Sequence, residues 1–390
     1  MTVDEQAIGG FVAPGLEAVR EEFERNFAER GEVGAAFAAT RHGELVVDLW
    51  GGLADSDAGR PWTADTAQVV FSGTKGLVAL CLLMLVDRGA LDVEDPVARY
   101  WPEFAEHAKD SLTVAELASH RARLPAVEGL ETPEDFLDPL RLAQLLASQR
   151  QSDDPRAGFV YHALTYGWLC GELVRRVDGR SVGAFFAEEV AGPLGLQIWI
   201  GTPPEVEARI ATLEYAPGWN SLSIKAGLPD DPLWAAIWTR PWVFPADDLY
   251  WNRRPFHEAE IPGAGGVGEA RSMARLYGCL ALGGELDGVR LLSEETLALG
   301  RRLRASGPDP FSGLSQAFGV GFAVQTERKT MGAPEDAFGH GGAGGSMHAA
   351  WPSQRVGVSY AMNQMRDADP VDARRAALLD RLYEALDADA

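Results

Sequence analysis

The sequence has no hydrophobic run long enough to cross a membrane and comparatively few basic residues. Its longest apolar stretch is about half of the ~20 residues that a membrane-spanning helix needs. There are 35 Lys and Arg residues against 57 Asp and Glu residues, which gives a net charge of −22. Nucleic acids and anionic membranes bind surfaces rich in Lys and Arg, so neither is expected as a partner. The acidic start, residues 1–5, lacks the basic and apolar parts of a signal peptide, and we expect a cytoplasmic protein.

Cysteine is scarce, and the histidines lack the spacing of a metal site. The three cysteines, Cys81, Cys170 and Cys279, are far apart and lie in apolar segments predicted to be helical. An odd number of separated cysteines is typical of reduced core thiols rather than of disulfides or a metal cluster. None of the seven histidines forms an H-x-x-x-H or H-E-x-x-H pattern. The sequence therefore predicts neither a metal site nor a cofactor.

What the sequence does have is a serine and a lysine, Ser72 and Lys75, directly before the apolar run 77–86. If that run is a buried helix, the two side chains lie one turn apart on the same face. A serine hydroxyl is a weak nucleophile until a base takes its proton. Lysine can be that base when burial lowers its pKa from about 10.4 toward 7. The S-x-x-K pattern thus indicates a nucleophile and its base; the alternative is a helix N-cap serine beside a surface lysine.

Strand-like segments occur near both ends of the chain, and helical segments fill the middle. Near the N-terminus a tight turn at 41–43 joins two predicted strands within 34–49. Near the C-terminus three predicted strands form an antiparallel meander: 318–324, 346–351 and 356–362. The predicted helices are 14–30, 77–86, 113–119, 133–149, 165–178, 181–191, 269–282 and a last one with Asp369 as N-cap and Pro370 at its first position.

This order predicts an α/β (α+β) fold with one antiparallel sheet, flanked by helices and built from both ends of the chain. Residues 1–100 and 265–390 would form the sheet domain, and residues 101–264 an inserted, mostly helical domain. Within the insertion, 215–260 holds five of the eleven tryptophans and many prolines. We expect this segment to line a substrate cleft or a dimer contact; the alternative is a loop with a small core of its own.

Short motifs occur in order over nearly the whole chain. They are G-R-P-W at 59–62, F-S-G-T-K-G at 71–76, L-D-V-E-D-P-V at 91–97, Y-W-P-E-F at 100–104, L-A-S-H at 117–120, Y-H-A at 161–163, G-P-L-G-L at 192–196 and H-G-G at 340–342. In this the chain resembles the class C β-lactamase-like serine hydrolases, which include penicillin-binding proteins and, as the best match, the family VIII carboxylesterases. So many ordered matches are more specific than S-x-x-K alone. The resemblance implies a β-lactamase/transpeptidase-like fold.

The resemblance also implies a role for each matching residue. Ser72 would be the acylated nucleophile and Lys75 its partner in deprotonation. Tyr161 would be the third catalytic residue and would match the tyrosine of the family's Y-x-N motif. The adjacent ammonium would lower the pKa of its phenol below about 10. The alternative for Tyr161 is a core tyrosine. The oxyanion would lie between the backbone N–H groups of Ser72 and Ala343, just after His340, Gly341 and Gly342.

Two departures from the family pattern bear on the substrate. Ala163 stands where β-lactamases have the Asn of Y-x-N, so the amide that would bind a lactam side chain is missing. His340-Gly341-Gly342 stands where they have K-T-G, which removes the cation and the hydroxyl that would hold a penicillin carboxylate. Both losses favour neutral esters. His340 would either donate to the substrate or orient its strand.

Other motifs in the chain compete with this interpretation. The G-x-S-x-G at 179–183 is preceded by a helix rather than by the strand of a nucleophile elbow, so Gly179 is predicted as a helix C-cap and Ser181 as an N-cap. Two G-x-G-x-x-G stretches, 263–268 and 339–344, lack a surrounding βαβ unit and are predicted to be turns. His120 and His162 are expected to be structural.

The sequence therefore predicts a serine esterase that hydrolyses a small short-chain carboxylic ester through an acyl-enzyme on Ser72. β-Lactamase activity, D-alanyl-D-alanine peptidase activity and acyl transfer to an acceptor other than water remain as alternatives, because all use the same acyl-enzyme. The alternative from another class is a non-catalytic ligand-binding relative.

Overall fold

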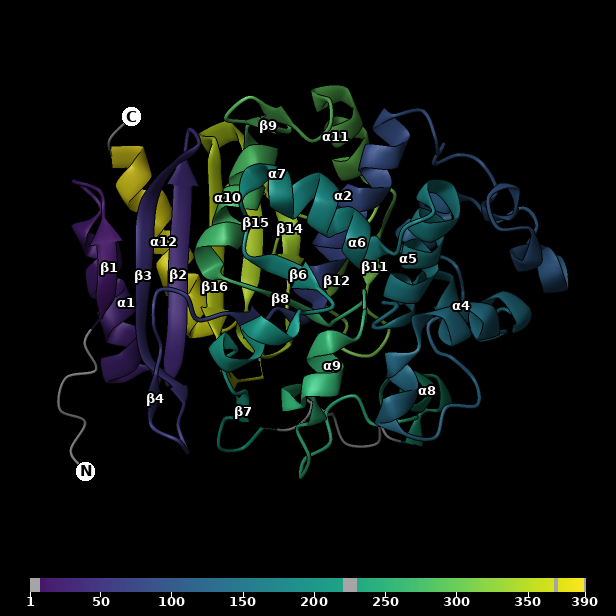
Figure 1. Cartoon of the computed structure of the whole chain (residues 1–390), viewed down its shortest axis with the longest axis horizontal. Coiled ribbons are helices and arrows are strands. Elements are labelled where there is room, and N and C mark those ends of the chain that lie inside the picture. Colours follow the sequence, from purple (N-terminus) through teal and green to yellow (C-terminus); the bar gives the residue numbers. More distant parts are fainter. Residues whose placement is uncertain (1–7, 220–229, 368–370, 389–390) are drawn as a thin grey trace.

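A large antiparallel sheet runs through the molecule (Figure 1). The computed structural model describes residues 8–219, 230–367 and 371–388. Within these residues ten strands pair in the order β1-β3-β2-β16-β15-β14-β13-β12-β11, with β4 on β3. Their bounds are β1 Gly9–Val12, β2 Gly34–Arg41, β3 Glu44–Asp55, β4 Arg60–Pro61, β11 Ala305–Pro308, β12 Ser315–Phe318, β13 Ala323–Val324, β14 Phe338–Gly341, β15 Met347–Trp351 and β16 Val356–Met362.

The sheet joins the two ends of the chain, as predicted. β2 and β16 pair antiparallel from Ala35 with Met362 to Arg41 with Val356. Smaller sheets connect further segments: β5 (Gln68–Val69) with β8 (Gly266–Gly268) and β6 (Ile198–Ile200), β7 (Glu214–Tyr215) with β17 (Gln364–Met365), and β9 (Glu285–Leu286) with β10 (Val289–Arg290). The predicted α/β fold with an antiparallel sheet is confirmed, whereas the domain boundaries at 100 and 264 stay a prediction.

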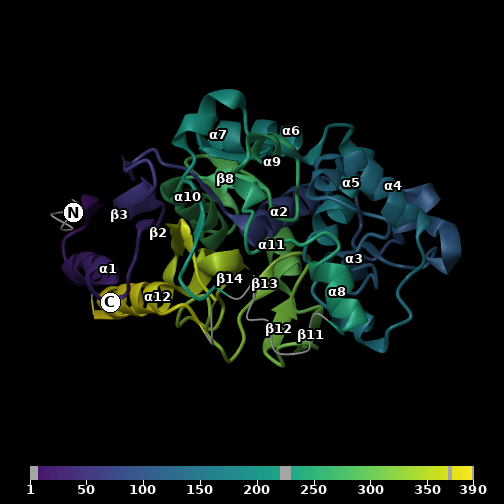
Figure 2. The same ribbon diagram turned by 90° about the horizontal axis from the view of Figure 1, so that it is seen from below.

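Helices cover both faces of the sheet and fill the middle of the chain. They are α1 Glu17–Glu29, α2 Thr74–Asp87, α3 Val114–Ala118, α4 Pro139–Ser148, α5 Thr165–Asp178, α6 Val182–Phe186, α7 Gly192–Leu194, α8 Pro232–Trp238, α9 Arg254–Glu258, α10 Ala270–Ala281, α11 Glu294–Arg301 and α12 Ala373–Ala388. Figure 2 shows α1 and α12 on one side of β2 and β3, and α10 on the other. Across the described residues, no helix combines the length and the apolar character that a membrane span requires.

The alternation of side chains along β2 explains why both faces are covered. Ala35, Phe37 and Ala39 belong to the apolar cluster of α1 and α12, which includes Leu378 and Leu382. The residues between them, Ala36 and Ala38, cluster instead with alanines of α10. Because successive side chains of a strand point to opposite faces, an all-apolar strand is buried on both sides.

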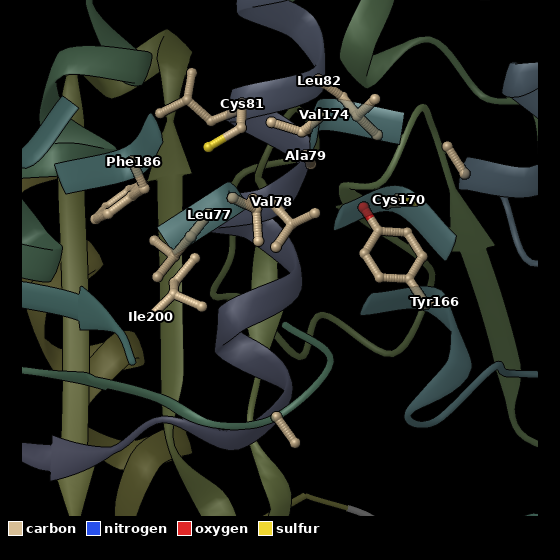
Figure 3. Packing of buried hydrophobic residues seen from close by; sticks show 14 of the residues in the cluster. Leu77, Val78, Ala79, Cys81, Leu82, Tyr166, Cys170, Val174, Phe186 and Ile200 are labelled. Atoms are coloured by element: carbon tan, nitrogen blue, oxygen red, sulfur yellow. The ribbon is translucent and has the colours of Figure 1, made fainter. Parts of the chain in front are cut away.

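Helix α2 carries the predicted nucleophile and is buried on all sides. Every residue from Thr74 to Leu85 is buried. Figure 3 shows Leu77, Val78 and Cys81 of α2 between Phe186 and Ile200 on one side and Tyr166, Cys170 and Val174 on the other. A helix that is apolar all round must lie inside the protein, so the run 77–86 predicted this position correctly.

Several predicted elements differ from the observed ones. The segment 318–324 is a tight hairpin of β12 and β13 rather than one strand, because Gly321 turns the chain with a φ of 84°. Strand β14 was not among the predicted strands. The helix predicted at 133–149 is divided: Asp138 and Pro139 begin α4 after a short 3₁₀ segment, since proline favours the first helical turn.

The ends of two further predicted helices also differ. The predicted helix 181–191 is α6 followed by a π-helical turn at Ala187–Ala191. The predicted start of the last helix at Asp369 and Pro370 lies outside the described residues. The observed α12 begins at Ala373, and the Asp372 carboxylate accepts a hydrogen bond from the Arg374 N–H at 2.9 Å. Four leucines of this helix are buried, namely Leu378, Leu379, Leu382 and Leu386.

Candidate active site

Ser72 lies in the short 3₁₀ segment Phe71–Gly73 that leads into α2. The preceding residue, Phe71, has a φ of +44°, a left-handed conformation that an aromatic residue rarely adopts. Its buried ring packs edge-on against Phe244 at 5.3 Å and Trp251 at 5.5 Å between centroids. This packing holds the strained backbone in place. Such strain is typical of functional sites, where it presents a side chain that a relaxed helix start would not.

Lys75 has no exposed surface and lies beside Ser72. Its Nζ is 3.1 Å from Oγ of Ser72 and donates hydrogen bonds to the carbonyl oxygens of Ala163 at 2.6 Å and Gly263 at 2.7 Å. Burial lowers the pKa of Lys75 well below its usual value. Neutral carbonyls do not offset the loss of hydration as a carboxylate would, so the expected lowering of this pKa is confirmed.

The two carbonyls also orient the Lys75 amine. A neutral amine has two hydrogens and one lone pair, and the carbonyls of Ala163 and Gly263 can only accept. Both hydrogens are therefore engaged by backbone oxygens, and the lone pair is left for the hydroxyl hydrogen of Ser72. This is the geometry of a general base next to a nucleophile.

Tyr161 lies next to this pair, as the sequence predicted. The centre of its ring is 4.8 Å from Nζ of Lys75, and its hydroxyl is 3.5 Å from Nε2 of His340. The predicted direction of its pKa is wrong, because burial raises the pKa of Tyr161 and an interaction with Ser72 offsets this only in part. An uncharged Lys75 provides no ammonium to stabilise a phenolate, so the buried phenol keeps its proton.

His340 is on β14 and faces Tyr161 across the site. Its Nδ1 lies 2.8 Å from the carbonyl oxygen of Gly341. A carbonyl only accepts, so Nδ1 carries the hydrogen and Nε2 presents its lone pair to Tyr161. Burial lowers the pKa of His340 to about 3. The histidine is therefore neutral and adds no cation to the site, which agrees with the predicted loss of a permanent charge.

The H-G-G segment approaches the serine through its glycines. A Cβ on Gly342 would lie 2.4 Å from the carbonyl oxygen of Val70, so only glycine allows this strand end to meet the turn before Ser72. Gly341 and Ala343 line the same cavity as Ser72. Ala343 therefore lies beside Ser72, as the resemblance implied. Its role as an oxyanion donor stays a prediction.

A cavity of about 210 Å³ opens beside Ser72. Its wall includes Leu164, Trp238, Val243 and Phe244. Trp238 comes from the segment 215–260, so the prediction that this segment lines a cleft is confirmed for that residue. The other tryptophans of the segment that the structure describes do not line the cavity. Trp251 packs behind Phe71, and Trp234 packs on Trp242 at 6.1 Å.

The histidines predicted to be structural are hydrogen-bonded, and one of them touches Tyr161. Nδ1 of His162 donates to the carbonyl of Val160 at 2.7 Å, and Nε2 accepts from the N–H of Leu124 at 3.2 Å. His120 accepts from the N–H of His162 at 3.1 Å. Its ring lies 4.8 Å from the ring of Tyr161. The contact between His120 and Tyr161 joins residues that are distant in sequence, and no local pattern indicated it.

The competing motifs have structural roles. Ser181 accepts a hydrogen bond from the N–H of Ala184 at 3.2 Å as an N-cap, and Gly179 ends α5 with a φ of 96°, as predicted. The first glycine-rich stretch supplies the Gly263 carbonyl to Lys75, a contribution that the sequence did not reveal. Its second half, Gly266–Gly268, is strand β8, so the prediction of a turn is wrong for that half. In the second stretch, Gly339–Gly341 belong to β14, so the prediction of a turn is wrong for its first half.

The cysteines do not contribute a nucleophile. Cys81, Cys170 and Cys279 are free and buried, as predicted. Burial raises the pKa of all three thiols, that of Cys279 to about 12. They therefore remain protonated and unreactive near neutral pH.

A buried lysine amine that faces a serine hydroxyl at the edge of a cavity is an arrangement typical of serine hydrolases. The family described as Beta-lactamase matches residues 19–382, and the chain belongs to this family. It is 35% identical over 380 residues to "Esterase/beta-lactamase LipL" of Mycobacterium tuberculosis, an alignment that covers 93% of this chain and 84% of the relative.

Solved structures agree with this assignment. The crystal structure of a family VIII carboxylesterase superimposes with a TM-score of 0.88 at 36% identity, over 97% of this chain and all of the other. A penicillin-binding protein homologue from Caulobacter crescentus gives the same TM-score, identity and coverage. The predicted β-lactamase/transpeptidase-like fold and the resemblance to family VIII carboxylesterases are confirmed.

Proposed function

We propose that the protein hydrolyses short-chain carboxylic esters through an acyl-enzyme on Ser72. The observation that carries this proposal is the environment of Lys75. Its amine is fully buried, lies 3.1 Å from the serine Oγ, and has carbonyl oxygens as its other partners. A lysine in such surroundings is neutral near pH 7 and serves as a base. The named esterases among its relatives favour an ester as the substrate.

In the acylation step Lys75 takes the proton of Ser72, and Oγ attacks the carbonyl carbon of the ester. The negative charge that develops on the carbonyl oxygen is stabilised by the backbone N–H groups of Ser72 and Ala343. Collapse of the tetrahedral intermediate breaks the bond to the alcohol oxygen. In the second half, water attacks the acyl-enzyme and the same groups move its proton in the reverse direction.

Tyr161 acts in this scheme as a proton donor and relay. Its raised pKa means that the phenol is protonated at neutral pH. It gives its proton to the departing alkoxide and recovers one from the Lys75 ammonium that formed when Ser72 was deprotonated. Before the ester bond breaks, Nε2 of His340 accepts from the phenol at 3.5 Å; the same hydrogen is then transferred to the alkoxide.

The site favours a neutral ester over a lactam acid or a D-alanyl peptide. Both of the latter carry a carboxylate, which requires a cation for recognition. His340 has a pKa of about 3 and is neutral, and Ala163 uses only its backbone oxygen, which is bound to Lys75. The cavity that Ser72 lines has no charged residue among the described residues of its wall, and the guanidinium of Arg328 lines the neighbouring cavity instead. The unpaired, buried cysteines support a reducing compartment, and we propose a cytoplasmic location.

Parallel assays with p-nitrophenyl acetate, p-nitrophenyl butyrate and nitrocefin test the proposal. We expect turnover of both esters and little or none of nitrocefin. Ser72→Ala should abolish ester turnover, and Ser181→Ala, at the other serine motif, is the matched control that should retain it. Turnover of nitrocefin without ester turnover would contradict the proposal. If none of these substrates is turned over and none forms a covalent adduct with Ser72, a ligand-binding protein is favoured instead.

A further inference from the structure

Tyr161 and Gly341 stand between two cavities of very different chemistry. Each cavity has a volume of about 210 Å³, and both residues line both of them. Ser72 and Ala343 line only the first cavity, and His340 lines only the second. The proposed catalytic groups therefore divide the space around the serine into two compartments.

The first cavity is apolar. Apart from the hydroxyls of Ser72 and Tyr161, its side chains are hydrophobic, with Trp238, Val243 and Phe244 forming one wall. None of the described residues that line it carries a charge. A polar group bound here would lose its hydration without gaining a partner, which is unfavourable. An aliphatic or aromatic group would instead be stabilised by burial.

The second cavity, the polar cavity, is mixed in character and more polar than the first. Half-buried side chains with hydroxyl or amide groups line it, namely Ser315, Gln316, Thr326 and Thr330, together with His340 and the guanidinium of Arg328. Apolar residues such as Phe318 and Met347 line it as well. Hydroxyl and amide side chains both donate and accept, and a guanidinium donates, so these groups suit a ligand that bears hydroxyl groups.

We propose that the acyl chain of the substrate occupies the apolar cavity and the alcohol occupies the polar cavity. The substrate class would be an ester of an apolar acyl chain with an alcohol that carries further hydroxyl groups. This inference rests on the proposed function. The acyl carbon becomes bonded to Oγ of Ser72, which lines only the apolar cavity, so the acyl chain extends there.

The leaving group follows from the same geometry. When the bond between the carbonyl carbon and the alcohol oxygen breaks, the alkoxide takes the proton of the Tyr161 hydroxyl. Tyr161 then recovers a proton from the Lys75 ammonium. Because Tyr161 also lines the polar cavity, the released alcohol is on that side, next to Gln316 and Thr330.

The apolar cavity determines how much of the acyl chain is buried. It has a volume of about 210 Å³ and opens to solvent. Butanoyl and hexanoyl groups are expected to lie against its apolar wall. The end of a dodecanoyl chain would extend past this wall and gain no further burial, so kcat/KM should not rise from hexanoyl to dodecanoyl esters.

Two isomeric esters test the orientation directly. Glyceryl 1-monobutyrate and butyl glycerate have the same composition, but the apolar and polar parts exchange sides of the ester bond. We expect kcat/KM, divided by the rate of alkaline hydrolysis of each ester, to be at least about tenfold higher for glyceryl monobutyrate. A preference for butyl glycerate, or no preference, would overturn the inference while leaving the proposed function intact. Failure to hydrolyse either isomer and p-nitrophenyl butyrate would overturn the proposed function itself.

Variants identify which cavity holds which part. Trp238→Ala should enlarge the apolar cavity and raise the dodecanoyl-to-hexanoyl ratio of kcat/KM by about fivefold or more. Trp242→Ala is the matched control, because this tryptophan belongs to the same segment, is 38% exposed and lines neither cavity. Thr330→Val should lower the preference for glyceryl monobutyrate over hexyl butyrate without changing the acyl-length ratio. If Trp238→Ala changes alcohol preference instead, the assignment of the two cavities is reversed.

Discussion

Among the lysines that the structure describes, Lys75 and Lys109 have no exposed surface, and they differ in their partners. Lys109 donates to three carbonyl oxygens, those of Glu106 at 2.9 Å, Ala147 at 2.9 Å and Gln149 at 2.7 Å. Lys75 donates to two carbonyls, and its third neighbour is the hydroxyl of Ser72. Both have a lowered pKa because of burial, but only that of Lys75 is lowered far below its usual value.

The difference shows what makes a buried lysine into a base. Three carbonyls accept all three hydrogens of an ammonium, and at Lys109 they include the C-terminal end of α4, where the helix dipole favours a cation. The Glu106 carboxylate also raises the pKa of Lys109. Lys75 has one carbonyl fewer, so its neutral form is fully hydrogen-bonded, and the lone pair faces a hydroxyl. Deeper burial of the Lys75 amine, the carboxylate near Lys109 and the number of acceptors together separate the two roles.

The largest expected effect is on activity and distinguishes the two sites. Lys75→Met should lower kcat/KM for p-nitrophenyl butyrate by about 10⁴-fold, since it removes the general base. Lys75→Arg should be equally inactive, because a guanidinium remains charged and cannot take a proton. Lys109→Met should retain kcat/KM within about threefold under conditions where it is folded. Substantial activity in Lys75→Arg would break the comparison.

The next effect concerns the proton relay. Tyr161→Phe should lower kcat by at least about 100-fold, because the alkoxide then leaves without a proton donor. Leaving groups that need no protonation should suffer less, so the loss with p-nitrophenyl butyrate should be smaller than with ethyl butyrate. An equal loss with both substrates would indicate a packing role for the ring instead of a relay.

A smaller effect, on stability, reverses the order of the two lysines. Lys109→Met leaves three carbonyls without their donor and should lower the free energy of unfolding by about 2–4 kcal/mol. Lys75→Met leaves two carbonyls unpaired but also removes an amine whose deprotonation opposes folding below its unfolded pKa. Urea unfolding of both variants checks this order. A larger loss for Lys75→Met would contradict it.

The smallest effect is a dependence of stability on pH. Lys75 is neutral in the folded protein but protonated in the unfolded chain below a pH of about 10.4. The unfolded state therefore binds one more proton, and the folded state gains stability as pH rises between the lowered pKa and about 10.4. The unfolding free energy of wild type minus that of Lys75→Met should therefore increase with pH by up to about 1.4 kcal/mol per unit. A difference independent of pH would show that Lys75 stays charged.

Local patterns predicted much of this site, and distant contacts determined the rest. The spacing of Ser72 and Lys75 and the apolar run of α2 predicted a buried pair, because helix periodicity and burial are properties of adjacent residues. The carbonyls of Ala163 and Gly263 are 88 and 188 residues from Lys75. No pattern within α2 indicated them, although they fix the direction of the amine.

Two of the errors in the prediction have the same origin. The phenol of Tyr161 was expected to have a lowered pKa, whereas burial by residues from other parts of the chain raises it. The sequence predicts one strand over 318–324, but a Cβ on Gly321 would lie 2.3 Å from the hydroxyl oxygen of Tyr166. The turn at Gly321 depends on a contact with α5, which is distant in sequence. The periodicity of a single strand contains no information about such a contact.

The pH dependence of Ser72 phosphonylation by a fluorophosphonate probe, in which Oγ displaces fluoride from phosphorus, tests the neutral lysine most directly. Peptide mass spectrometry identifies the labelled residue, and the labelling rate is measured from pH 5 to pH 11. We expect the label on Ser72, with a rate that has already reached its plateau well below the ordinary lysine pKa of about 10.4. Labelling of another residue, or a rate that rises only near that pKa, would contradict the account.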